Sequence, residues 1–191
     1  YSVHPIEVAN ILTDLKLDSA TITTGLLHDT IEDTYATYET IKGEFGDEVA
    51  ELVDGVTKIS VLENTATSNS KAENFRKLIL ATSKDIRVLL VKIADRLHNM
   101  RTIKAINKID KRERIAQETM EIYAPLADRM GMHRIRDELE DLSFEILNND
   151  ARALIQKRLD EIKLDKKDIF ESLSSEFNDL LLKNNISSEI H

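Results

Sequence analysis

Glycine and proline are scarce in this chain, which holds five Gly and two Pro among 191 residues. These two residue types supply most of the special backbone conformations that tight turns and hairpins require. Charged residues make up 32% of the sequence and aromatic residues 5%, and this mixture, rich in Ala, Leu, Ile, Lys and Glu, favours helices. We therefore expect an all-α fold, with length enough for one domain and a helical appendage.

Charge and apolar patterning exclude several classes of protein. The formal net charge is −9, which opposes binding to a nucleic-acid backbone unless basic residues gather locally, so we expect no DNA partner. The longest apolar run covers four residues, 88–91, far short of the roughly 20 that a membrane helix needs. Because the chain has no cysteine, disulfides and thiolate metal sites are excluded. We expect a cytoplasmic protein without a membrane partner.

Apolar residues recur at helical spacing along most of the sequence. The expected helices are 5–15, 20–28, 38–53, 72–82, 85–106, 112–126 and 135–147, with two more after residue 151. Asp54-Gly55 should end the helix over 38–53, and Gly131 should separate the helices over 112–126 and 135–147. Residues 63–71 offer little to bury, and we expect a loop there. We expect a domain over 1–150 and a helical linker over 151–191.

The most informative motif is the pair His28-Asp29, followed four residues later by Glu32-Asp33. Imidazole and carboxylate groups are both ligands of divalent metal ions. If one helix runs through the motif, Glu32 stacks over His28 and Asp33 over Asp29, which keeps both acids near an ion. They could then accept a proton from water or donate one to a leaving group. The motif also fits a plainer interpretation, in which His28 caps a helix and the acids lie on the surface.

Two residues far away in the sequence can complete a ligand set. His4 precedes Pro5, which suits the first turn of a helix. Asp95, Asn99 and Thr102 stand at i, i+4 and i+7 and form a polar stripe on a helix with many apolar residues. Such a stripe lines a cavity or forms a solvated edge, and the spacing does not distinguish these. Together, these possible ligands indicate a metal-dependent phosphohydrolase. They are His4, His28, Asp29 and Asp95.

Other side chains near the stripe have less specific patterns. His98 points about 60° away from Asp95 around the helix, and we expect a structural role for it. Several cations could contact phosphate groups or could be solvated charges and ion-pair partners. These are Lys92, Arg96, Arg101 and Lys104. Neither a Gly-rich phosphate loop nor a His-Glu-x-x-His zinc motif occurs in the sequence.

Seven motifs, in order, resemble those of one family. They are His4-Pro5 with the residues that follow it, 28–34 (His-Asp-Thr-Ile-Glu-Asp-Thr), 54–58, 72–77, 92–102 (Lys-Ile-Ala-Asp-Arg-Leu-His-Asn-Met-Arg-Thr), 123–127 and 138–144. Over roughly residues 1–147 the sequence resembles the N-terminal hydrolase domain of the Rel/Spo family of bifunctional (p)ppGpp synthetase/hydrolases, the enzymes of the stringent response.

The resemblance implies an all-helical HD-type fold. It also implies hydrolysis of the 3′-pyrophosphate of the alarmones ppGpp and pppGpp, giving GDP or GTP and pyrophosphate. In this family a manganese ion, Mn2+, is held by the positions matching His4, His28, Asp29 and Asp95. The positions matching Glu32 and Asp33 serve hydrolysis, and those matching Asn99 and Thr102 contact the nucleotide. Spacing itself does not select manganese over zinc or magnesium.

The family carries basic nucleotide-binding residues ahead of the position of Tyr1 and a synthetase domain further along, and this sequence includes neither. Two alternatives therefore stay open. One is an HD phosphohydrolase that acts on another nucleotide. The other is a catalytically silent helical module that regulates an attached synthetase or docks a partner.

Overall fold

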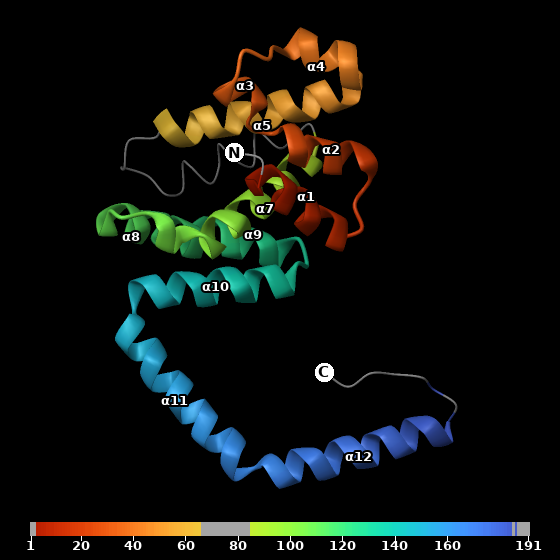
Figure 1. The fold of residues 1–191 in the computed structure, drawn as a ribbon, viewed down its shortest axis with the longest axis vertical. Coiled ribbons are helices and arrows are strands. Elements are labelled where there is room, and N and C mark those ends of the chain that lie inside the picture. The colour runs from red at the N-terminus through yellow and green to blue at the C-terminus, as the bar shows by residue number, and fades with distance from the viewer. Residues whose placement is uncertain (1–2, 66–84, 185, 187–191) are drawn as a thin grey trace. The chain divides into compact units, whose positions relative to one another are not determined.

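The computed structural model describes residues 3–65, 85–184 and 186, and every regular element within these ranges is a helix (Figure 1). The prediction of an all-α fold is confirmed. The chain divides into two compact units, Tyr1–Leu147 and Asn148–His191. Among the described helices, none has the length and apolar character needed to cross a bilayer.

The first unit is a bundle built around one central helix, α7 (Arg87–Arg101). Ten of the fifteen residues of α7 are buried, because α1, α2, α5 and α10 all pack against it. The other elements of this unit are α1 (Val3–Asp14), α2 (Ser19–Leu27), α3 (Thr30–Asp33), α4 (Tyr38–Phe45), α5 (Asp47–Thr65), the 3-10 helix η1 (Ile103–Ala105), α8 (Ile109–Glu118), the π-helix η2 (Thr119–Tyr123), α9 (Ala124–Arg129) and α10 (His133–Leu147).

Three of the buried residues of α7 are polar, namely Lys92, Asp95 and His98. Polar side chains enter a helical core only when they find partners there, because burial removes their hydrogen bonds to water. The polar face of α7 therefore lies against other polar groups inside the bundle. Of the two interpretations of the stripe at Asp95, the solvated edge is wrong for Asp95 itself, whose exposed fraction is 8%.

The second unit consists of α11 (Asn149–Asp165) and α12 (Lys167–Lys183), which confirms the two helices expected after residue 151. Both helices carry large apolar side chains that are exposed, among them Leu154, Leu159, Leu173 and Phe177.

Two predictions of helix ends are wrong. The expected helix 38–53 is two helices, because the chain turns at Gly46 with φ +89°, a conformation that glycine adopts without strain. The second of them, α5, does not stop at Asp54-Gly55 but continues to Thr65. A Cβ atom on Gly55 would lie 2.8 Å from Cγ2 of Val88, so this glycine serves close packing of α5 on α7 rather than a turn.

The remaining boundaries differ less. Residues 63–65, expected to begin a loop, are helical, while the rest of that loop and the helix expected over 72–82 lie outside the described residues. The helix expected over 85–106 ends at Arg101, and the one expected over 112–126 changes to a π-helix at Thr119. The break expected near Gly131 is confirmed.

A close approach of α1 and α2 positions the ends of both helices. Asp18 caps α2 by accepting a hydrogen bond from the backbone N–H of Thr21 at 3.1 Å. Further along α2, a Cβ atom on Gly25 would lie only 2.5 Å from Cδ1 of Leu12, a side chain that is completely buried. The two helices can therefore pack at this distance only because residue 25 has no side chain.

We predict opposite effects for two Gly→Ala substitutions in helices. Gly25→Ala should lower the free energy of unfolding by about 1–3 kcal/mol, because Leu12 cannot move out of the core to admit a methyl group. Gly43→Ala, in α4 with no atom near the added methyl group, should raise it by about 0.5–1 kcal/mol. Urea unfolding followed by circular dichroism measures both, and stabilisation by Gly25→Ala would contradict the packing of α1 on α2.

Candidate metal centre

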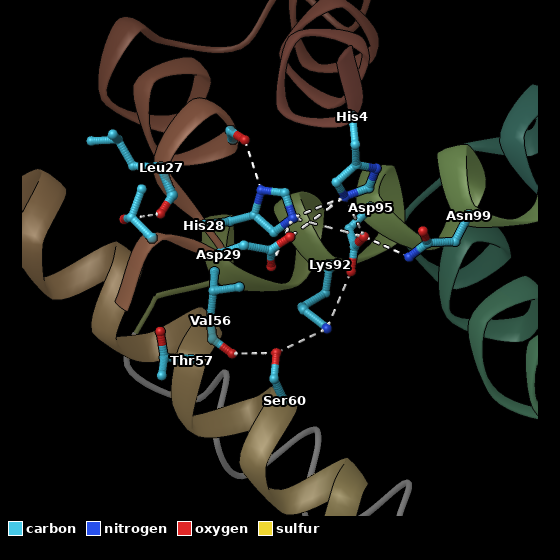
Figure 2. A network of polar contacts seen from close by, with 12 residues as sticks. His4, Leu27, His28, Asp29, Val56, Thr57, Ser60, Lys92, Asp95 and Asn99 are labelled. Carbon is cyan, nitrogen blue, oxygen red and sulfur yellow. Dashed lines mark hydrogen bonds and ion pairs between the residues drawn. The ribbon is translucent and has the colours of Figure 1, made fainter. Parts of the chain in front are cut away.

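Four side chains from three parts of the chain meet beside the N-terminal end of α1. His4 lies in the first turn of α1, His28 and Asp29 follow the last residue of α2, and Asp95 lies in the middle of α7. Figure 2 shows these side chains pointing toward one another. The structure therefore brings together all four residues that the sequence suggested as metal ligands.

The distances among their donor atoms are short. Nε2 of His4 and Nε2 of His28 are 3.2 Å apart. Nε2 of His28 lies 3.1 Å from Oδ1 of Asp29, and Nε2 of His4 lies 3.7 Å from Oδ2 of the same residue. Oδ1 of Asp95 lies 3.3 Å from Nε2 of His4 and 3.8 Å from Nε2 of His28.

This donor set fits a divalent metal ion. Ligand atoms held at roughly 2.1 Å from one ion lie about 3 Å from each other, close to the spacing of most of these pairs. Donor atoms of His4, His28 and Asp29 all lie within 4.8 Å of one another, and Asp95 adds a carboxylate oxygen next to both imidazoles.

The orientation of His28 is suitable for a ligand. Its Nδ1 lies 2.8 Å from the carbonyl oxygen of Gly25, one turn earlier in α2. Since a carbonyl oxygen only accepts, Nδ1 carries the proton of the neutral ring, and Nε2 keeps its lone pair for the cluster. Burial opposes protonation of this imidazole, but the hydrogen bond to Asp29 and the charges of Asp95 and Asp29 outweigh it, and the pKa of His28 is raised.

A break in the backbone lets the neighbours His28 and Asp29 share one centre. The helix expected over 20–28 ends as α2 at Leu27, and it does not run on through the motif, because α3 begins separately at Thr30. His28 is the C-cap of α2, as the plainer interpretation expected, and still directs Nε2 into the cluster. Asp29, with φ −96° and ψ −1°, then turns the chain.

Asp95 is held from both sides by residues of its own helix. Nδ2 of Asn99 donates to Oδ1 at 2.7 Å, and Nζ of Lys92 lies 3.3 Å from Oδ2 (Figure 2). Lys92 also donates to the hydroxyl of Ser60 on α5 at 3.3 Å. Burial opposes ionisation of Asp95, but the charge of Lys92 and the hydrogen bond with His4 outweigh it, so the pKa of Asp95 lies below its ordinary range.

The acidic pair of α3 lies on the exposed side of the cluster. Partial burial raises the pKa of Glu32, against the opposing effects of a hydrogen bond from Ser60 and the charge of Lys92. Asp33 lines a pocket of about 300 Å³ together with His4, Asp29, Pro5, Leu26, Thr30 and Thr34. The pocket therefore opens onto two of the candidate ligands and one of the candidate catalytic acids.

Of the two residues expected to contact a nucleotide, Asn99 touches the cluster through Asp95. Thr102 caps the end of α7, and its hydroxyl donates to the carbonyl of His98 at 3.0 Å. The ion-pair interpretation holds for all four cations near the stripe, including Lys92, which pairs with Asp95. Arg96 pairs with Glu118, Arg101 with Glu138, and Lys104 with Glu145.

We expected only a structural role for His98, but its side chain lies directly beside the cluster. Its Nδ1 lies 2.6 Å from Nδ1 of His4, and its exposed fraction is 9%. The sequence held a signal for this contact, because His98 stands three residues after Asp95 and residues at that spacing lie on the same side of a helix.

A family model described as "HD domain" matches residues 1–133. The chain is 50% identical over 190 residues to a protein of Brucella ovis named GTP pyrophosphokinase rsh, covering 100% of this chain and 25% of that protein. It is 48% identical over 176 residues to guanosine-3′,5′-bis(diphosphate) 3′-pyrophosphohydrolase of Haemophilus influenzae, covering 92% and 26%. The chain thus spans about a quarter of the length of the curated relatives it matches.

The fold is similar to that of a solved structure described as a metazoan ortholog of SpoT that hydrolyzes ppGpp. The TM-score is 0.53 at 27% sequence identity, and the similarity covers 78% of this chain and 80% of the other.

We predict that binding of a divalent metal ion to this centre, with Mn2+ as the probe, weakens as the pH falls. Because the pKa of His28 is raised above its ordinary value, a proton competes for the ring below that raised pKa, and affinity should fall by about tenfold per pH unit there. Above it, affinity should be constant. Titration of Mn2+ followed by electron paramagnetic resonance between roughly pH 5 and pH 8 tests this. The variant His133→Asn, at an exposed position, should show the same profile, and an affinity independent of pH would contradict the role of His28.

Proposed function

Because the chain belongs to the HD domain family, we propose that it hydrolyses the 3′-pyrophosphate of ppGpp and pppGpp with the help of a divalent metal ion. An HD domain implies dependence on such an ion. In the proposed reaction, water attacks the phosphorus atom bonded to the ribose 3′ oxygen, and the bond between that phosphorus and oxygen breaks. The products are pyrophosphate and GDP or GTP.

The observation that carries this proposal is the convergence of two imidazoles and two carboxylates from α1, the end of α2 and α7. Two names add support for the substrate. The Haemophilus influenzae relative is named for this reaction, and the metazoan protein of similar fold is described as hydrolysing ppGpp.

We propose Mn2+ as the ion, held by His4, His28, Asp29 and Asp95. A mixed set of nitrogen and oxygen donors is compatible with manganese. When bound, such an ion lowers the pKa of a coordinated water and draws electron density from a phosphoryl oxygen.

The acids of α3 would move the protons of the reaction. Glu32, whose pKa is raised because burial disfavours its charged form, is suited to hold a proton and donate it to the departing 3′ oxygen. Asp33, which lines the pocket beside Asp29, is suited to orient the attacking water and accept its proton. Asn99, in the last turn of α7, and Thr102, the residue that caps this helix, would contact the nucleotide.

We also propose that this chain acts beside a synthetase domain in a longer protein. The similar Brucella ovis protein is about four times as long and is named for pyrophosphokinase activity. Hydrolysis and synthesis of the same nucleotide would then be carried by separate segments of one polypeptide.

Replacing Asp29 by Ala should abolish pyrophosphate release from ppGpp, because the substitution removes a metal ligand and leaves the helical core intact. Asp33→Asn should lower kcat by about 100-fold or more while metal content stays near one ion per chain, since a carboxylate that transfers protons is lost and the ligands are not. Pyrophosphate-release assays, metal analysis and circular dichroism give the three readouts.

The matched control is Asp110→Ala, an exposed carboxylate in the first turn of α8, which should keep activity and metal. Turnover by Asp29→Ala, or turnover that survives a chelator, would contradict the proposed function. Equal loss of metal from both site variants would instead make Asp33 a ligand.

A further inference from the structure

We propose that His98 is a positioning residue for the metal ligand His4, acting through a hydrogen bond between their Nδ1 atoms. The proposal rests on the proposed metal site. Nδ1 of His98 lies 2.6 Å from Nδ1 of His4, and the ring centroids are 4.7 Å apart with the ring planes tilted by 52°.

The contact constrains where the protons lie. Two ring nitrogens at this distance share a single proton, so one donates and the other accepts. For His4 to offer a lone pair from Nε2 to an ion, its Nδ1 must carry the proton of the neutral ring. His98 then accepts through Nδ1 and carries its own proton on Nε2.

The arrangement at His4 parallels that at the other imidazole. Nδ1 of His28 lies 2.8 Å from the carbonyl oxygen of Gly25, and Nε2 of both rings points into the cluster, 3.2 Å apart. Histidine ligands generally donate their second N–H to an acceptor that orients the ring. The backbone supplies that acceptor for His28. For His4, a side chain of α7 lies in the corresponding place, because Nδ1 of His98 is at hydrogen-bonding distance from Nδ1 of His4.

His98 is placed by the helix that also carries a ligand. It stands three residues after Asp95 in α7 and is buried, so its ring has little freedom to leave His4. The helix α7 therefore aligns two ligands. It carries Asp95 itself, and it holds His4 through the contact with His98.

Two variants separate hydrogen bonding from packing. His98→Asn keeps an acceptor, because the amide oxygen of Asn lies near the position of Nδ1 in His, but loses volume. His98→Leu keeps volume and removes the acceptor. A positioning role predicts that His98→Leu weakens Mn2+ affinity by about 10- to 100-fold and that His98→Asn stays closer to the original protein. A packing role predicts the reverse order.

Mn2+ affinity of the intact chain is measured by electron paramagnetic resonance of the free ion, and urea unfolding of the metal-free protein checks that each variant folds. The control His133→Leu, at an exposed position, should bind Mn2+ within about twofold of the original. If His98→Leu does not fold, His98→Ala replaces it with the same expectation. Equal affinities, or stronger binding by His98→Leu than by His98→Asn, would overturn the inference alone. Failure of the original protein to bind Mn2+ would overturn the proposed metal site and the inference with it.

Discussion

The packing of α1 and α2 onto α7 is the constraint on which the candidate metal centre depends. His4, His28 and Asp95 belong to three different elements, so the distances between their donor atoms follow from how the helices pack. The same three elements share one apolar core, in which Leu12 of α1 lies against Gly25 of α2. Because such a core is dense and resists deformation, it can hold ligand atoms at fixed separations before any ion binds. The carbonyl of Gly25 then orients His28, which links the packing of α1 on α2 directly to the centre.

Much of the fold follows from the sequence, and the two wrong predictions of helix ends both involve glycines. Scarcity of Gly and Pro, with apolar residues at helical spacing, predicts an all-helical chain correctly. The resemblance to the Rel/Spo hydrolase domain is confirmed by the relatives. Local signals fail at Gly46 and Gly55. Gly46 was assigned to a helix interior but turns the chain with a positive φ, and Gly55 was assigned to a helix end but packs against Val88 inside α5. Single-residue turn signals do not report which helix lies across from a glycine.

The candidate site was predictable in its ligands but not in the residues that support them. Adjacent His and Asp residues, and a polar stripe beginning at Asp95, are visible along the chain, and the structure brings them together. The role of His98 was only partly visible, because its spacing from Asp95 gives its side of α7 but not the approach of His4, 94 positions away, to that side. Helical spacing gives the direction in which a side chain points from the helix axis. It does not identify the group on another element that the side chain contacts. The break between α2 and α3 was left open for a similar reason, since His28 is compatible with both a helix interior and a cap.

Electrostatics explains why the proposed chemistry requires a cation at this position. Asp29, Glu32 and Asp33 bring up to three negative charges to the exposed side of the centre, and buried Asp95 adds another beside them, in a chain whose formal net charge is −9. A substrate with two diphosphate groups would be repelled from that side. The ammonium of Lys92 offsets part of the charge, but it is buried with its Nζ against Asp95, and its effect on the pKa of Glu32 is outweighed by partial burial of that acid. A divalent ion beside Asp29 and His4 would be the largest positive charge in the site and would reverse the local sign. Substrate binding and catalysis would then depend on the same ion, and loss of any ligand would be expected to impair both.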